Sequence, residues 1–403
     1  MMLKPRLLRQ GLLAKKSMFR FVGCLLGVFV MAACSSEEAG LQTAALGTTY
    51  FVSSSGNDAA SGTAPRSAWR SIARVNAQTF VPGDKVRFRG TETFSGNLYL
   101  DRDDAGTPAN PVVISSYGSG RATINAGDGN GLFVYNAAGL VVRDLNFVGA
   151  GTETNTGHGI VFFADQPGAL KYDYIRIDRA RVSGFLQGGV IIGADNKQTH
   201  TGYRDVRITR VVSNGNGDSG IQLYGRASNP STRACANADV YIGYSKVYSN
   251  RGKPNKGTNT GNGIVLGGVN GAVIERSLAY DNGELNDFGG GGPVGIWAYD
   301  ANNVTIQYNE AYSNKTGSNK DGGGFDLDGG VSNSVMQYNY SHDNEGAGFL
   351  LGQYRGAGPF TGNTVRYNIS ENDGRKSSYG GIYLFAAPGF DVQTPLSITT
   401  RSS

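Results

Sequence analysis

A glycine followed by an apolar residue recurs between residues 159 and 382, at intervals of 24 to 43 residues. Between consecutive anchors lie a second apolar run, such as Val240-Tyr241-Ile242, and a segment that ends in asparagine, such as Tyr248-Ser249-Asn250. Self-similarity at this period indicates a solenoid, in which each repeat stacks on the next. The anchors are Gly159-Ile160, Gly189-Val190, Gly220-Ile221, Gly263-Ile264, Gly295-Ile296, Gly324-Phe325, Gly348-Phe349 and Gly381-Ile382.

Each repeat holds short apolar runs separated by Gly and Asn, and no long segment of helical periodicity interrupts them. Asparagine tolerates a left-handed backbone, and its amide can bond to the equivalent side chain one coil away. We therefore expect ladders of polar side chains along the solenoid. One column is Asn250, Asn282, Asn314, Asn344 and Asn372, and a second is Ser245, Ser277, Asn309, Asn339 and Asn368.

The composition agrees with a turn-rich β protein. The 403 residues include 61 glycines, and 17% of the residues are charged, which argues against disorder and coiled coil. The formal charge of +5 comes from residues 1–33, which hold six Lys and Arg and no acid. The remainder has 31 cations against 32 anions, so nucleic acid is not an expected partner.

Residues 1–33 have the pattern of an export signal. Their apolar run, Phe21 to Met31, is shorter than the roughly 20 residues that span a bilayer. Ala32-Ala33-Cys34 resembles a bacterial lipobox, which implies that Cys34 is acylated, and Ser35 favours the outer membrane. Secretion after simple cleavage is the alternative. We predict a lipoprotein signal at 1–33, a tether at 34–47, and no membrane contact beyond the lipid anchor.

Cysteine usage excludes disulfides in the mature chain. Cys24 lies in the leader and Cys34 would carry lipid, so Cys235 is the remaining thiol. An exported protein of this kind must obtain its stability from backbone pairing and a long core.

The repeats, together with Thr49-Tyr50-Phe51-Val52-Ser53, Gly56-Asn57-Asp58 and Pro82-Gly83-Asp84, resemble the pectate-lyase-like superfamily of right-handed parallel β-helices. The resemblance covers roughly residues 48–385 and implies an all-β, single-stranded solenoid with three short parallel sheets. It also implies a substrate groove on an outward sheet face.

We expect an N-terminal cap and first coils over 48–130, the β-helix over 131–385, and a C-terminal tail over 386–403. Residues 67–77 place Trp69, Ile72 and Val75 on one helical face, which would plug the N-terminal end. The tail offers no evident amphipathic cap, and an open end exposes unpaired strand edges. Either the tail folds over that end, a partner covers it, or the chain is truncated relative to its relatives.

Alternation along each strand separates inside from outside. The residue after each anchor glycine, and the residue two positions further on, are apolar and point inward, as Ile264 and Leu266 do. The residues between them must point outward. The first outward column is Gln222, Val265, Trp297, Asp326, Leu350 and Tyr383, and the second is Tyr224, Gly267, Tyr299, Asp328, Gly352 and Phe385.

Aromatic rings beside paired carboxylates suit an oligosaccharide. Asp326 and Asp328 lie two residues apart, with Cα atoms about 6.6 Å apart in a strand, a spacing that suits the acid and base of a glycosidase. We predict that they are catalytic, with Asp300 and Asp321 close enough to assist. The alternative is that both are polar residues on a solvated strand, or that they bind a stabilising Ca²⁺ with Asp321. The predicted sugar contacts are Trp297, Tyr299, Tyr224, Gln222, Tyr383 and Arg226.

A lyase acting on uronic polysaccharides is the second catalytic reading. It would need a cationic base, for which Lys320, Arg355 and Arg226 are candidates, and Ca²⁺ held by Asp326, Asp328 and Asp321. No cofactor is required by the hydrolase reading. A uronate C5-epimerase and a non-catalytic surface solenoid that binds glycan or another cell remain as alternatives.

Two histidines are not expected to be catalytic. Gly157-His158-Gly159 is similar to a polygalacturonase motif, but the carboxylates follow far later in the chain, so we treat the match as coincidence. His342 occupies the repeat position of Tyr248, Tyr280 and Tyr312, which predicts a stacked ladder residue. The sequence thus favours an exported enzyme that cleaves a polysaccharide, neutral or uronic, on one outward face of the solenoid.

Overall fold

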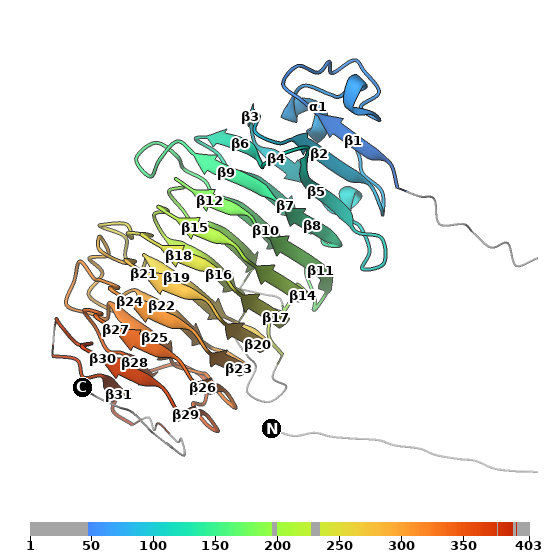
Figure 1. Cartoon of the computed structure of the whole chain (residues 1–403). Helices are drawn as coiled ribbons and strands as arrows, with labels where there is room; N and C mark the ends of the chain where they lie inside the picture. Colours follow the sequence, from blue (N-terminus) through green and yellow to red (C-terminus); the bar gives the residue numbers. More distant parts are fainter. Residues whose placement is uncertain (1–46, 196–199, 227–233, 377, 390–391, 393–403) are drawn as a thin grey trace, which may run out of the picture. The chain divides into compact units, whose positions relative to one another are not determined.

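Three parallel β-sheets wind around one apolar core in the computed structural model, which describes residues 47–195, 200–226, 234–376, 378–389 and 392. Every coil contributes one strand to each sheet, and each strand pairs with its counterparts in the preceding and following coils (Figure 1). This confirms the predicted all-β solenoid. The predicted leader, the lipidation site Cys34 and most of the tail lie outside the described residues.

The first sheet, sheet A, has 11 strands in the order β1-β2-β5-β8-β11-β14-β17-β20-β23-β26-β29. Their bounds are β1 Thr49–Val52, β2 Lys85–Arg89, β5 Val112–Tyr117, β8 Leu140–Arg143, β11 Lys171–Asp178, β14 Gly202–Thr209, β17 Asn237–Gly243, β20 Val269–Glu275, β23 Asn302–Gln307, β26 Val335–Gln337 and β29 Thr364–Arg366.

Sheet B has 10 short strands and follows sheet A in each coil. Its strands are β3 Thr93–Ser95, β6 Ala122–Gly127, β9 Leu145–Gly149, β12 Arg181–Ser183, β15 Val212–Asn214, β18 Lys246–Tyr248, β21 Leu278–Tyr280, β24 Glu310–Tyr312, β27 Tyr340–His342 and β30 Ile369–Glu371.

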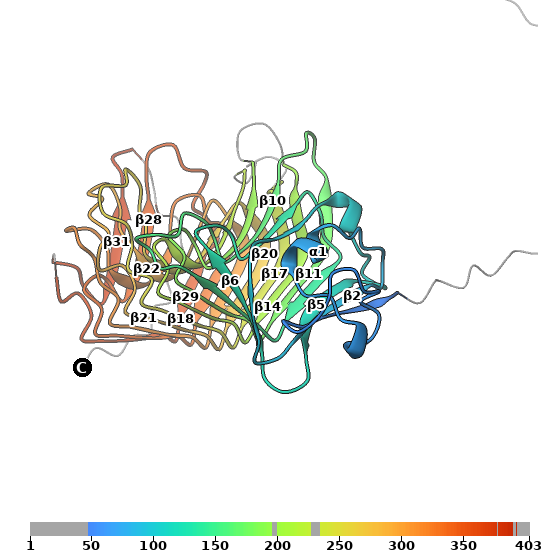
Figure 2. The ribbon, with the colours of Figure 1, turned by 90° about the horizontal axis from the view of Figure 1, so that it is seen from above.

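Sheet C, also of 10 strands, holds the anchor glycines and completes each coil. Its strands are β4 Leu98–Leu100, β7 Leu132–Tyr135, β10 Ile160–Ala164, β13 Val190–Ala194, β16 Ser219–Tyr224, β19 Asn262–Gly267, β22 Val294–Tyr299, β25 Gly323–Leu327, β28 Phe349–Gln353 and β31 Ile382–Ala386. Seen from above, the strands of successive coils run side by side from the blue end to the red end (Figure 2).

Helix is scarce in the described residues. It consists of α1 (Ile72–Asn76) and two single turns, η1 (Pro65–Ser67) and η2 (Arg102–Asp104). The predicted cap is therefore shorter than 67–77. Ser71 ends the preceding extended segment and caps α1 by accepting a hydrogen bond from Arg74 N–H. Ile72 and Val75 are buried as expected, but Trp69 lies before the helix, where it bridges to Val52.

The core confirms the inward positions read from the repeat. Ile264 pairs with Ile296, and Leu266 with Ala298, and all four side chains are fully buried. Leu384 keeps the inward register, since it pairs with the buried Leu351, but it is 45% exposed because, in the described part of the chain, no strand pairs with the outer edge of β31. The apolar side chains of β31 therefore remain on the surface.

The asparagine ladder runs along the turn that follows sheet B. Asn250 Nδ2 donates to Asn282 Oδ1 at 3.0 Å, and Asn282 Nδ2 donates to Asn314 Oδ1 at 3.0 Å. The second column makes the same contacts, with Asn309 Nδ2 donating to Asn339 Oδ1 at 3.1 Å. The predicted ladders are confirmed over these coils.

Two details of the ladder differ from the prediction. The left-handed residue is the one before each ladder asparagine, for example Ser313 with φ of 52°. The ladder side chain itself must point into the turn. In the last coil Asn372 therefore takes the left-handed position, with φ of 51°, and Asp373 accepts from Asn344 at 2.7 Å.

Aromatic rings stack beside this ladder. The rings of Tyr248, Tyr280 and Tyr312 lie 4.8 Å apart, and His342 continues the stack 4.9 Å beyond Tyr312. Glu310 and Asp343 also hydrogen-bond the imidazole, which raises the His342 pKa even though burial acts in the opposite direction. His342 is the stacked ladder residue that the repeat predicted.

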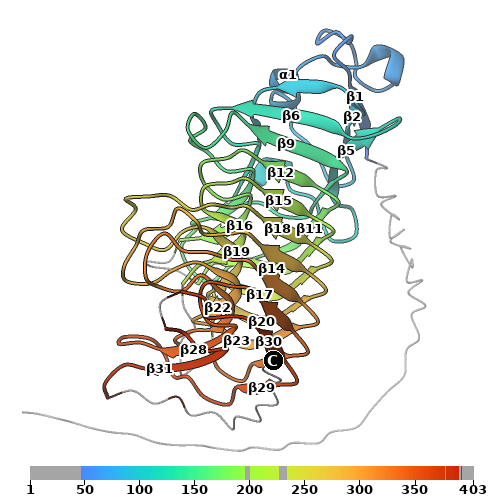
Figure 3. The same cartoon turned by 60° about the vertical axis from the view of Figure 1, so that its left-hand side comes forward.

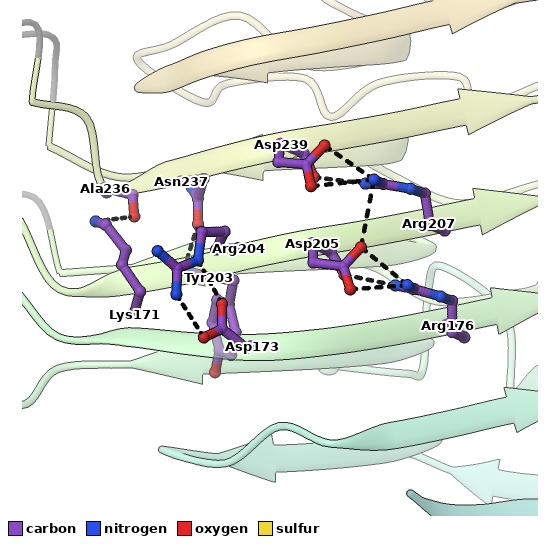
Figure 4. Close-up of polar contacts among 10 residues, drawn as sticks. All are labelled: Lys171, Asp173, Arg176, Tyr203, Arg204, Asp205, Arg207, Ala236, Asn237 and Asp239. Carbon is purple, nitrogen blue, oxygen red and sulfur yellow. Dashed lines mark hydrogen bonds and ion pairs between the residues drawn. The ribbon is translucent and has the colours of Figure 1, made fainter. Parts of the chain in front are cut away.

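Sheet A is reinforced by arginine–aspartate pairs between coils, shown in Figure 4. Arg176 of β11 makes a bidentate contact with Asp205 of β14 at 2.8 and 2.9 Å. Arg207 of β14 repeats the contact with Asp239 of β17 at 2.9 and 3.0 Å. These pairs add charge-assisted bonds to the backbone ladder. In the same view, the Lys171 ammonium donates to the Ala236 carbonyl at 2.6 Å.

Among the described residues, every helix is too short and too polar to be a membrane span.

Replacing Asn282 with alanine should lower the free energy of unfolding by about 2–4 kcal/mol, because buried donors and acceptors on both neighbouring coils lose their partner. The shift of the urea unfolding midpoint measures this loss. Asn319→Ala, at an exposed position outside the ladder, should change stability by less than about 0.5 kcal/mol. Equal losses in the two variants would contradict a stabilising ladder.

Candidate active site

The outward face of sheet C forms the floor of a cavity of about 980 Å³. All six members of the first outward column line it, as do five of the second, since Gly267 is absent from the lining. Those are Gln222, Val265, Trp297, Asp326, Leu350 and Tyr383, and then Tyr224, Tyr299, Asp328, Gly352 and Phe385. The alternation of side chains along the strands therefore located the floor correctly.

Long loops between sheets B and C form one wall. Residues 249–261, 281–293 and 313–322 connect these sheets in three successive coils, whereas residues 184–189 and 215–218 suffice in the coils before them. Figure 3 shows these yellow-to-orange loops projecting beyond the sheets before β19, β22 and β25. They bring Lys256, Phe288 and Asp321, among others, to the cavity. The solenoid supplies a flat floor, and the loops convert it into a recess.

Asp326 lies on the floor of the cavity and is only 2% exposed. Its strand neighbours on the two adjacent coils are Trp297 and Leu350, so its carboxyl group has an apolar residue on either side. Oδ1 of Asp326 accepts no hydrogen bond in the structure. Burial raises the Asp326 pKa well above its usual value, with Asp328 and Asp321 adding to the effect. The alternative of a solvated strand is therefore wrong for this residue.

Asp328 follows β25 directly and is less deeply covered than Asp326. Its carboxylate leans over Gly352 of the next coil, where an added Cβ would lie 2.7 Å from Oδ1. Burial raises the Asp328 pKa to about 7, with Asp321 and Asp300 contributing. The backbone N–H of Gly329 donates to it at 2.8 Å and partly offsets this shift. A carboxylic acid with this pKa can donate a proton near neutral pH.

Asp321 enters the cavity from the third of the long loops and is held by two donors. The backbone N–H of Gly292 donates to Oδ2 at 2.6 Å, and the Tyr379 hydroxyl donates to Oδ1 at 3.3 Å. Burial raises the pKa of Asp321, while these bonds favour the ionised form. Asp321 thus has two donors, whereas Asp300 has one, the backbone N–H of Gly358, and Asp326 Oδ1 has none. The sequence had marked Asp321 only as an assisting acid or metal ligand.

The aromatic side chains of the floor occupy space that glycines leave open. A Cβ on Gly267 would lie 2.2 Å from the Tyr299 ring, and one on Gly193 would lie 2.4 Å from the Tyr224 ring. The rings of Trp297 and Tyr299 have centroids 5.2 Å apart and an interplanar angle of 32°. Both rings line the cavity, so an apolar sugar face could contact them.

Trp297 differs from its prediction in exposure. It faces outward from the coil, yet it is only 6% exposed because it packs with Val265, Val294 and Tyr299. Its indole N–H donates to Asn262 Oδ1 at 3.0 Å, which fixes the ring against the start of β19. The predicted solvent-facing platform is therefore an enclosed one. At the open end of the sheet, Tyr383 remains 37% exposed.

The predicted cations divide between the cavity and other surfaces. Lys320 lines the cavity beside Asp321. Arg355 and Arg226 are not among the described residues that line it, and Arg355 is exposed. A long side chain at a turn is not positioned by strand alternation, so the sequence could not place these residues.

The calcium set expected for a lyase is not formed. Over the part of the chain that the structure describes, no three His, Cys, Asp or Glu side chains come close enough to hold a metal ion. Asp326 lies among apolar neighbours and Asp321 is directed by Gly292 and Tyr379, so these two and Asp328 do not converge.

Several cavity residues had no signal in the repeat. Tyr354 packs on Gly329, where an added Cβ would lie 2.4 Å from its ring, and burial and nearby acids raise its pKa. His158, whose motif we treated as a coincidental match, lines the other end of the cavity with Asp218 and Lys256. The one sequence signal for a long loop at the cavity was the interval of 43 residues between Gly220 and Gly263, which contains the loop 249–261 and its Lys256. His158 lies two residues before β10, which is separated from β16 in sheet C by β13 alone.

Comparison with known proteins places these observations in context. A family model described as "Right handed beta helix region" matches residues 189–393. A lacto-N-biosidase of Bifidobacterium longum subsp. longum is 24% identical over 467 aligned positions, which cover 91% of this chain. The alignment covers 28% of that enzyme, so the chain spans about a quarter of the length of this curated relative.

A solved structure has the same fold. The GH136 lacto-N-biosidase from Eubacterium ramulus superposes with a TM-score of 0.63 and 18% sequence identity. The superposition covers 88% of this chain and 67% of that one.

Asp328→Asn should change how stability depends on pH. Because the folded state raises the Asp328 pKa from 3.8 to about 7, ionisation above pH 4 occurs first in the unfolded chain and destabilises the native state as the pH rises. The variant should therefore gain stability relative to wild type between pH 4 and pH 8, by on the order of 2–4 kcal/mol. Urea unfolding at several pH values measures the difference.

Glu153→Gln, at an exposed acid outside the cavity, provides the control and should show no such gain. A stability difference between Asp328→Asn and wild type that stays constant over this pH range would show that Asp328 ionises normally.

Proposed function

We propose that this chain, which belongs to the right-handed β-helix family, is a glycoside hydrolase acting on an oligosaccharide or polysaccharide bound along sheet C. The observation that carries the proposal is Asp328: a carboxyl group with a pKa of about 7, in a cavity that also holds Asp321 and a cluster of aromatic rings. The name of the relative, lacto-N-biosidase, denotes a glycosidase and supports the same reaction class.

In this proposal Asp328 is the general acid. A glycosidic oxygen leaves as a hydroxyl only if it is protonated, and a carboxylic acid with a raised pKa supplies that proton. Burial and the neighbouring acids keep Asp328 protonated at the start of the reaction. Release of its proton leaves a carboxylate, which must recover a proton before the next turnover.

Asp321 is the second carboxylate. Its two donors, Gly292 N–H and the Tyr379 hydroxyl, hold it in one orientation and favour its charge. From that position it either attacks the anomeric carbon or removes a proton from the attacking water. Asp326 was the predicted partner of Asp328, but a buried, protonated acid with an unbonded oxygen suits neither task. Its raised pKa instead avoids a further negative charge beside the pair.

The aromatic side chains supply substrate contact. Trp297 and Tyr299 present ring surface within the cavity, and Gln222 and Tyr224 continue the lining toward the N-terminal coils. Sugar C–H faces pack on such rings, while polar groups bind hydroxyls.

Other reaction classes receive less support. An elimination would need a cationic base, and of the three predicted candidates Lys320 alone lies in the cavity. A binding scaffold would not need an acid whose pKa is tuned to about 7, although structural networks also shift pKa values. A hydrolase explains more of the residues that line the cavity than a lyase, an epimerase or a non-catalytic solenoid does.

Asp328→Asn should reduce hydrolysis by about 10²–10⁴-fold, the usual contribution of a general acid, and Asp321→Asn should do the same. Wild-type activity should fall as the pH rises through about 7, because Asp328 must be protonated. The assay incubates the protein with neutral and uronic polysaccharides and follows both new reducing ends and the ultraviolet absorbance of unsaturated sugars.

Asp103→Asn, at a side chain that is 77% exposed and outside the cavity, is the matched control and should retain full activity. Reducing ends accompanied by absorbance, and abolished by a chelator, would establish a lyase instead. Product formation that survives Asp328→Asn would overturn the assignment of the acid.

We further propose that the protein is exported and anchored by a lipid on Cys34, with the outer membrane as its destination. The basic leader, its short apolar run and Ala32-Ala33-Cys34 support this. Such an anchor would hold the enzyme where large polysaccharides are accessible.

Cys34→Ala should abolish incorporation of radiolabelled palmitate when the full chain is expressed in a Gram-negative host, and should move the protein from the membrane fraction to the soluble fraction. Cys24→Ala, within the leader, should leave labelling intact. Equal labelling of the wild type and Cys34→Ala would refute acylation at this residue.

A further inference from the structure

The cavity has a second polar cluster at its N-terminal end, which we call the lysine cluster. It consists of Gln187, Asp218 and Lys256, which line the cavity beside His158, and of Lys253, which contacts Gln187 and Asp218 but is not among the described lining residues. The Lys256 ammonium lies 2.6 Å from Asp218 Oδ2, and the Lys253 ammonium lies 3.3 Å from the same oxygen. Lys253 also donates to Gln187 Oε1 at 2.5 Å.

Strand register places this cluster in the same groove as the catalytic acids but away from them. Asp218 precedes β16 and Asp321 precedes β25, and β16, β19, β22 and β25 pair in that order. Three steps of about 4.8 Å separate the two positions by about 14 Å along the solenoid axis. A ligand that reaches both must therefore extend over several coils.

The charges of the two ends are opposite. Two ammonium groups against one carboxylate leave the lysine cluster with one excess positive charge, in a region where Lys253 is only 14% exposed. At the catalytic end Asp326 and Asp328 are protonated, so Asp300 and Asp321 supply the negative charge, with Lys320 beside Asp321. An excess charge enclosed in a cavity is stabilised by a counter-ion of opposite sign.

His158 adds a donor without adding charge. Its Nδ1 accepts a hydrogen bond from Gly188 N–H at 3.1 Å, so in the neutral ring the proton resides on Nε2. Burial, together with Lys253 and Lys256, holds the His158 pKa at about 4, although Asp218 opposes the shift. At neutral pH the cluster thus combines two ammonium groups with the amide of Gln187 and an imidazole N–H.

We propose that the lysine cluster binds one anionic substituent of the sugar chain, a uronate carboxylate or a sulfate ester, several units away from the bond that is cleaved. This inference rests on the proposed function, because it assigns the substrate class of the same groove. The Lys256 ammonium, whose side chain is 39% exposed, makes the contact, and Asp218 holds it in place. The acidic groups at the other end exclude a second anion from the catalytic position.

The test measures binding in the Asp328→Asn background, so that cleavage is not required. Isothermal titration calorimetry compares oligogalacturonate with its methyl ester, and carrageenan oligosaccharides with their desulfated form. We expect at least one anionic form to bind about tenfold more tightly than its neutral counterpart, the value of a single charge-assisted contact. The pair that shows the preference identifies the anion.

Adding Lys256→Met should reduce this preference to within about twofold, while Lys256→Arg should retain most of it. Lys246→Met, at an exposed lysine of sheet B, is the matched control and should leave the preference unchanged. Equal or absent binding of the charged and neutral forms would overturn the inference. Loss of affinity for both forms alike in Lys256→Met would also overturn it.

The two proposals can fail separately. Preferential binding of an anionic form that wild-type protein never cleaves would refute the hydrolase and leave the lysine cluster supported. Hydrolysis of a neutral glycan, with no preference for any charged form, would refute the anion site and leave the hydrolase supported.

Discussion

Parallel backbone pairing between successive coils is the constraint on which the rest of this structure depends. Because side chains alternate along a strand, a shift of one residue between coils would move every buried side chain to the outside. The register is held by buried polar contacts at the turns, where Asn282 bonds to both Asn250 and Asn314. It is held again on sheet A, where Arg176 reaches Asp205 on the next coil. Apolar packing alone would tolerate a shift of two residues, which keeps each side chain on its own face, whereas these directional contacts would not.

The same register arranges the candidate site. Trp297 and Asp326 are neighbours across two coils because Ile296 and Phe325 pair beneath them in the core. Glycines at outward positions then decide where large side chains lie, as Gly267 does for Tyr299. The solenoid therefore fixes the positions of the side chains on this face. The long loops between sheets B and C supply the enclosure that raises the pKa values of the acids.

Residues in the strands were the ones that could be predicted from the sequence. The period identifies each strand, and parity then assigns Ile264 inward and Trp297 outward without reference to any other coil. Parity does not describe what lies above the outward face. For that reason the burial of Asp326 and the enclosure of Trp297 were not predicted. The replacement of Asn372 by Asp373 in the ladder of the last coil was also missed, because it occurs in a turn, where strand alternation does not apply.

The sequence by itself determined the solenoid, its three sheets, its ladders and the face that carries the acids, because those features repeat and each copy reinforces the reading. Only the tertiary structure decided that Asp321 joins Asp328, and that His158 and Lys256 share a cavity with them. These residues lie in loops of unequal length, whose paths depend on contacts with neighbouring coils rather than on any local pattern. Charge and burial at the site are properties of that enclosure, so they arise only once the coils have stacked.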